Sequence, residues 1–84
     1  MKQVEIFLVK WFEEKGIPPE IDQVNLSTIN IFDSGLISSL EVIYLISDVE
    51  ENFSFRFNEE AFQDRRFNTI SGISEIVSEL IESV

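Results

Sequence analysis

The residues best suited to covalent chemistry are serines at the start of a helix-forming run. They lie in the stretch Phe32-Asp33-Ser34-Gly35-Leu36-Ile37-Ser38-Ser39-Leu40-Glu41. The chain has no histidine and no cysteine, so the usual general base, the usual zinc ligand and any disulfide are missing. A serine in a first helical turn can still receive a phosphate, because the exposed amides and the helix dipole favour negative charge there. The stretch is therefore a candidate target of modification rather than a catalyst.

The same residues also suit a purely structural role. Ser38 followed three residues later by Glu41 is a capping box, in which each side chain satisfies an exposed amide of the first turn. Ser34 is a rival nucleophile, but its Asp-Ser-Gly context favours a turn residue. A calcium loop is excluded because Gly35 and Ile37 stand where oxygen ligands are required. Capping and modification both remain open from these residues alone.

Periodic apolar residues predict the elements that position this stretch. A first helix is indicated by Val4, Phe7, Leu8, Trp11 and Phe12. Gly16 can end it in the left-handed conformation, and two prolines then forbid its continuation. Residues 20–37 lack sustained periodicity and predict a long, packed loop.

Three further helices are expected after this loop. The second begins near Ser38 or Ser39 and runs to about Asn52. Its apolar stripe consists of Val42, Leu45, Ile46, Val49 and Phe53. A short third helix covers residues 58–63, with Asn58 as its cap, and a fourth begins after Asn68 or Thr69. The fourth is the clearest amphipathic segment, with Ile70, Ile73, Val77, Leu80 and Ile81 on one face. Residues 53–57 alternate in polarity but have no partner strand, so an extended loop is expected.

Composition limits the function classes. A chain of 84 residues predicts one small domain, residues 1–84, and its net charge of -10 makes nucleic-acid binding improbable. Partners with basic patches are expected instead, because opposite charge speeds their encounter. No segment is long and apolar enough to span a membrane, and the amino terminus lacks a secretion-type pattern, so a cytoplasmic location is expected. With no base, metal set or nucleotide-binding loop, the chain is not expected to be an enzyme.

The order of these elements, together with the serine motif, resembles the acyl and peptidyl carrier proteins that bind phosphopantetheine. The resemblance runs from about Val4 to Ile81. In that family the modified serine lies in an Asp-Ser-Leu triplet preceded by a glycine and an apolar residue. Three segments are similar to family patterns: residues 32–40, Glu50-Glu51-Asn52-Phe53 and Phe67-Asn68-Thr69-Ile70.

The resemblance implies an all-α fold, a small four-helix bundle with three main helices, a short third helix and a long first loop. It also implies that a phosphopantetheinyl transferase attaches 4'-phosphopantetheine from coenzyme A to Ser39. The arm would then carry an acyl or aminoacyl group as a thioester between biosynthetic enzymes, with the protein acting as a monomer. Fatty acyl, polyketide, D-alanyl and other aminoacyl carriers share these features, so the sequence leaves the identity of the carried group open.

A docking strip is expected on the face of the second helix that points away from the core. Its members are Leu40, Glu41, Ile43, Tyr44, Ser47, Asp48 and Glu51. Apolar members would give contact area and acidic members would steer loading and processing enzymes that carry basic docking patches. The alternative is an ordinary solvated face with Leu40 covered by the preceding loop.

Two departures from the family pattern affect recognition. Ser38 replaces the aspartate of the triplet, which preserves the cap but removes a carboxylate beside the attacking hydroxyl. Tyr44 stands where carriers often have an acidic residue. An unmodified acidic helical module that binds a basic partner is therefore the competing interpretation.

The family can also shelter an acyl chain between helices. Residues that could line such a cavity are Phe7, Trp11, Leu45, Ile46, Phe62 and Ile76. An apolar helix face is core in most proteins, so ordinary packing is the alternative for these side chains.

Overall fold

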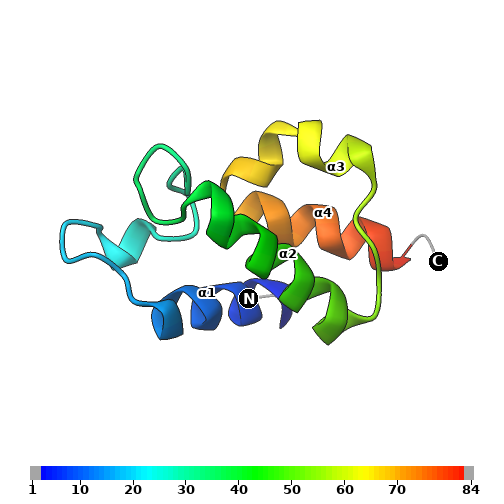
Figure 1. Ribbon diagram of the computed structural model, residues 1–84, viewed down its shortest axis with the longest axis horizontal. Coiled ribbons are helices and arrows are strands. Elements are labelled where there is room, and N and C mark those ends of the chain that lie inside the picture. The colour runs from blue at the N-terminus through cyan, green and yellow to red at the C-terminus, as the bar shows by residue number, and fades with distance from the viewer. Residues whose placement is uncertain (1–2, 83–84) are drawn as a thin grey trace.

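The computed structural model describes residues 3–82, and within that range it contains helices and loops but no strand. The α-helices are α1 (Gln3–Lys15), α2 (Ser39–Phe53), the short α3 (Glu59–Gln63) and α4 (Ile70–Glu82). Two short 3-10 helices, η1 (Gln23–Asn25) and η2 (Arg65–Asn68), lie in the connections. In the view of Figure 1, α4 lies between α1 and α3. The predicted all-α fold, with one short helix and a long first loop, is confirmed.

Local chemistry sets the helix ends. Gly16 has a φ of +106°, and its N–H donates to the Phe12 carbonyl at 3.0 Å, which closes α1 as expected. Ser38 caps α2, and the Asn58 side chain accepts from the Ala61 N–H at 2.9 Å to cap α3. α2 ends at Phe53, and the next residue, Ser54, caps it with a left-handed φ of 55°. These boundaries agree with the sequence predictions to within one or two residues.

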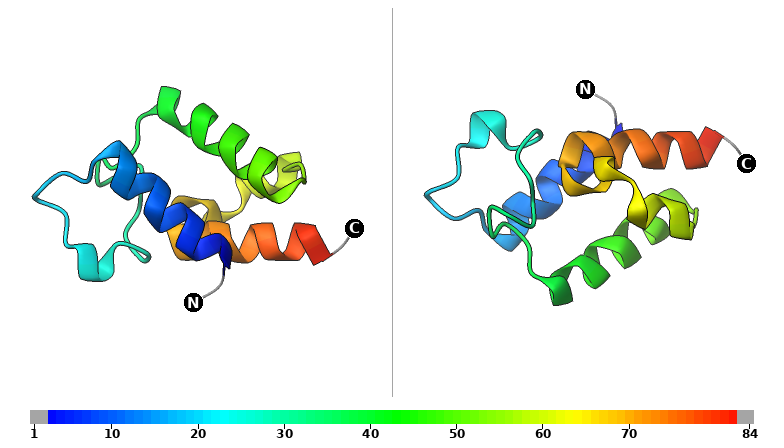
Figure 2. Two further views of the ribbon diagram at one scale, coloured as in Figure 1. Left: turned by 90° about the horizontal axis from the view of Figure 1, so that it is seen from below. Right: turned by 90° about the horizontal axis from the view of Figure 1, so that it is seen from above.

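The loop from Gly16 to Ser38 is folded against one end of the helices (Figures 1 and 2). Its apolar side chains Leu26, Ile31, Leu36 and Ile37 are buried. Backbone hydrogen bonds tie it to the end of η2 and the start of α4. The Ile31 N–H donates to the Asn68 carbonyl at 2.8 Å, and the Ser71 N–H donates to the Ser27 carbonyl at 2.9 Å. The predicted packing of this loop is therefore observed, and it holds the segment that precedes α2 in place.

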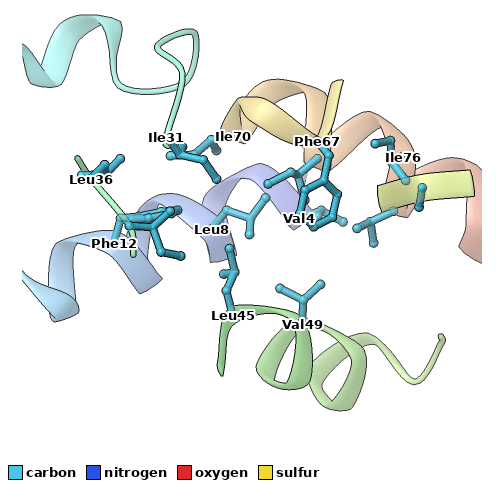
Figure 3. Packing of buried hydrophobic residues seen from close by; sticks show 14 of the residues in the cluster. Val4, Leu8, Phe12, Ile31, Leu36, Leu45, Val49, Phe67, Ile70 and Ile76 are labelled. Carbon is cyan, nitrogen blue, oxygen red and sulfur yellow. The ribbon is translucent and has the colours of Figure 1, made fainter. Parts of the chain in front are cut away.

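The core is formed where the three main helices and this loop meet. Figure 3 shows side chains from α1, α2, η2, α4 and the loop pointing toward one another, among them Val4, Leu8, Phe12, Ile31, Leu36, Leu45, Val49, Phe67, Ile70 and Ile76. Two predictions for apolar positions are wrong: Phe62 is 47% exposed and Ile81 is 36% exposed. Phe62 packs one side of its ring against Phe57 and Phe67, while Ile81 lies in the last turn of α4, which extends toward the periphery (Figure 1).

Phe12→Ala should lower the free energy of unfolding by about 3–5 kcal/mol, the usual cost of emptying a buried phenylalanine site. Phe12 has 0% exposure and lies in the last turn of α1, against the packed loop (Figure 3). Urea unfolding followed by far-ultraviolet circular dichroism would measure the change. A loss below about 1 kcal/mol would contradict this packing, because it would mean that the site collapses without cost.

Candidate functional site

Ser39 is the first residue of α2 and is exposed to solvent. Figure 2 shows the first turn of α2 at the edge of the molecule in both views. Backbone amides of a first helical turn have no partner within the helix, and they lie at the positive end of the helix dipole. A phosphate ester on the Ser39 hydroxyl would therefore be exposed to solvent and would lie next to the positive end of the α2 dipole, which stabilises negative charge.

The residue before it, Ser38, is occupied by capping. Its Oγ accepts a hydrogen bond from the Glu41 N–H at 3.2 Å, and its own N–H donates to Glu41 Oε1 at 3.0 Å. The predicted capping box is confirmed. Ser38 therefore caps the helix without a carboxylate.

Ser34 lies in a turn, as its sequence context suggested. Its Oγ accepts from the Leu36 N–H at 3.4 Å, and its N–H donates to the Asn30 carbonyl at 3.1 Å. Gly35 follows with a φ of +75°, which explains the glycine. Ser34 is exposed, but it lies outside the helix, so a phosphate there would lack the helix amides.

A lysine from α1 anchors the start of α2, a link that the sequence analysis missed. Lys15 Nζ donates to the Leu36 carbonyl at 2.8 Å and pairs with Glu41 Oε2 at 3.2 Å. The hydrogen bond from the Ser38 N–H lowers the pKa of the Glu41 carboxyl below its usual value. The hydrogen bond and positive charge of Lys15 lower it further. The end of α1, the loop and the first turn of α2 are thus joined directly beside Ser39. The sequence hints at this link only through charge, because Lys15 lies in the last turn of α1 and Glu41 lies in the first turn of α2.

Glu41→Gln should lower Tm near neutral pH, and the difference from the native protein should shrink as the pH falls below about 4.5, the ordinary value for this carboxyl. A pKa lowered by folding adds stability above the unfolded-state pKa and loses it as the pH falls through the folded-state value. Thermal melts of both proteins between pH 7 and 3 measure this difference. An equal difference in Tm at pH 7 and at pH 3 would show that the charge of the Glu41 carboxylate does not stabilise the start of α2.

The docking strip is apolar and exposed where it adjoins Ser39. Leu40, Ile43 and Tyr44 are 64%, 60% and 58% exposed, so covering of Leu40 by the preceding loop is excluded. Their spacing of three and four residues places them on one helix face. Ser47 and Glu51 are also exposed, as predicted.

Two acidic members of the strip are already engaged with α1. Glu41 is half-buried in its pair with Lys15, and Asp48 Oδ2 accepts a hydrogen bond from the Trp11 indole N–H at 2.8 Å. Asp48 is exposed, as expected for a residue that faces away from the core, but its carboxylate is already bonded to the Trp11 side chain of α1. The helical periodicity of the sequence predicts which face of α2 is exposed, but it does not predict that α1 lies beside that face.

The residues proposed to shelter a cargo do not share one environment. Leu45 and Ile76 belong to the core, and Phe62 lies on the surface. Ile46 is half-buried against the core. Phe7 and Trp11 instead line a groove between α1 and α2 of about 640 Å³. The proposed interior site is thus divided between packed core, surface and groove.

The described part of the chain contains no group of three or more acidic, histidine or cysteine residues placed to hold a metal ion. Within residues 3–82, no helix is long and apolar enough to cross a bilayer. Comparison of the chain with protein-family models, with curated proteins and with solved structures finds no match. Function is therefore inferred from the geometry around Ser39 and the motif that contains it.

Proposed function

We propose that this protein is a stand-alone carrier that bears a 4'-phosphopantetheine arm on Ser39. The observation that carries the proposal is the position of Ser39: an exposed hydroxyl at the first residue of a capped helix, next to an exposed apolar strip. The motif around it, residues 32–40, resembles the modification site of carrier proteins. A capping role alone would explain Ser38 but not the neighbouring exposed serine and strip.

The modification would need a base and a metal from another protein. A transferase would remove the Ser39 proton while Oγ attacks the phosphorus that joins phosphopantetheine to the nucleotide in coenzyme A. A phosphodiester to Ser39 forms, the pyrophosphate bond breaks, and the adenosine bisphosphate leaves. The residues of this chain would supply an accessible hydroxyl, a fixed helix start and a positive helix end for the new phosphate.

The exposed strip on α2 would present the arm to its enzymes. Leu40, Ile43 and Tyr44 offer apolar contact area close to Ser39, and the surrounding acids favour partners with basic patches. Acyl or aminoacyl groups would be held as thioesters and passed between enzymes of fatty acid, polyketide or peptide biosynthesis, in a cytoplasmic setting where coenzyme A is available. The protein would supply the tether and the docking face and would catalyse nothing itself.

The proposal is tested by intact-mass measurement of the purified chain after incubation with coenzyme A, magnesium and several broad-specificity phosphopantetheinyl transferases. The expected result is a gain of one arm. A known carrier protein in a parallel reaction establishes that each transferase is active. No gain with any active transferase would contradict the carrier function.

An unmodified acidic module is the second candidate, because the same exposed apolar strip would serve a partner directly. That function needs no hydroxyl at Ser39, so Ser39→Ala would leave partner binding unchanged. A carrier would lose its activity in the same variant. The two candidates are therefore separated by one substitution.

A further inference from the structure

The helices α1 and α2 lie antiparallel and enclose the groove introduced above. Side-chain contacts join them at three levels: Lys15 with Glu41, Trp11 with Asp48, and Phe7 with Phe53, whose ring centroids are 5.4 Å apart. The groove occupies the region of the last two levels, away from Ser39. Its lining consists of Phe7, Lys10, Trp11, Glu14, Asp48, Glu51 and Asn52.

The groove combines aromatic surface with excess negative charge. Phe7 and Trp11 are only partly buried, so aromatic surface is accessible from solvent. Carboxylates stand on both helices, Glu14 on α1 and Asp48 and Glu51 on α2, against one ammonium group from Lys10. A planar cation suits such a site because it can stack on an aromatic ring while its edge donates to carboxylates.

We propose that this groove binds an arginine side chain of a partner protein. Glu14 lies three residues after Trp11 on α1, and Glu51 lies three residues after Asp48 on α2, so each acid is one turn from a member of the Trp11–Asp48 pair. A guanidinium beside Trp11 can therefore reach acids on both helices. A lysine ammonium would gain the charge attraction but neither the stacking nor the forked donors.

The net charge of -10 complements a basic partner, and the groove gives that attraction a defined position. It also continues the docking strip, because Asp48 follows Tyr44 by one helical turn. The helical rise separates Asp48 from Ser39 by about 14 Å along the axis, so arginine binding does not require the arm. The inference is thus independent of the proposed carrier function.

The test uses Trp11, the one tryptophan of the chain, as a fluorescent reporter. The probes are an alanine-rich helical peptide with two arginines one turn apart and a twin with lysines in their place. In about 0.1 M salt, where screening extends over about 10 Å, the arginine peptide should shift the Trp11 emission saturably and bind at least fivefold more tightly than its twin.

Charge-matched variants separate the groove from general attraction. Glu14→Gln and Glu51→Gln should each weaken binding of the arginine peptide by fivefold or more. Glu13→Gln removes the same charge from an exposed position of α1 outside the groove, and it should change Kd by less than twofold. Equal weakening by Glu13→Gln, equal affinity for the lysine peptide, or no saturable shift would each overturn the proposal. Ser39→Ala should bind the arginine peptide as tightly as the native chain does. Failure of the groove proposal and failure of the carrier proposal can therefore be told apart.

Discussion

Ser39→Ala should receive no phosphopantetheine under conditions in which the native chain gains one arm. The phosphodiester requires Oγ, and the two neighbouring serines are poor substitutes because Ser34 and Ser38 both accept backbone hydrogen bonds. The fold should be retained, since Ser39 is exposed and the cap belongs to Ser38. Labelling with a fluorescent coenzyme A analogue and a transferase, read after gel electrophoresis, measures the loss.

Two serine variants serve as controls for this loss. Ser34→Ala should be labelled like the native chain. Ser38→Ala should also be labelled, although loss of the cap should cost about 1 kcal/mol of stability. A thermal melt of Ser39→Ala that matches the native melt would show that its lost labelling is not unfolding. Persistent labelling of Ser39→Ala would contradict the assigned site.

Gly72→Ala should destabilise the protein by about 3 kcal/mol or more, at or above the upper end of the usual cost of overpacking a core. A Cβ at position 72 would meet the Arg66 carbonyl oxygen, 1.9 Å away, and this is a backbone atom. Arg66 cannot move aside easily: its carbonyl accepts from the Thr69 N–H, and its guanidinium pairs with Asp64 at 2.9 Å and with Glu79 at 2.6 Å. In an open helix the same change would stabilise by about 1 kcal/mol, so the contact with η2 decides the sign.

The free energy of unfolding in urea, followed by circular dichroism, shows which effect is larger. The clash with η2 predicts a loss of stability in Gly72→Ala, whereas helix propensity alone predicts a gain. Ser47→Ala changes an exposed position inside α2 and serves as the matched control, with an expected change of a few tenths of a kcal/mol in favour of the variant. A Gly72→Ala protein as stable as the native one would show that η2 does not press on α4 as described.

Features set by a few neighbouring residues could be predicted from the sequence. The stop at Gly16, the capping box at Ser38 and Glu41, and the Asn58 cap each depend on chemistry within one turn, and all three are observed. The apolar stripes likewise gave the helices and most of the core. The exposed side of α2 followed from the same periodicity.

Features that depend on how elements meet could not be predicted. The contacts of Lys15 with Glu41 and of Trp11 with Asp48 join residues distant in the sequence, and they redirect two acids that a helical wheel places on an open face. From the sequence alone, Gly72 is an unfavourable residue inside a helix. The structure explains it, because η2 packs so closely against α4 that a Cβ at position 72 would meet the Arg66 backbone. Phe62 is exposed because α3 is short and packs on one side only.

Fragmentation mass spectrometry of the modified chain would locate the arm on a single residue. After incubation with coenzyme A, magnesium and an active transferase, the chain is digested and the peptide that gains the arm is sequenced by its fragments. We expect the added mass on Ser39 alone. Mass located on Ser34, Ser38 or any other residue, or no modified peptide in a reaction that modifies a known carrier, would contradict this assignment.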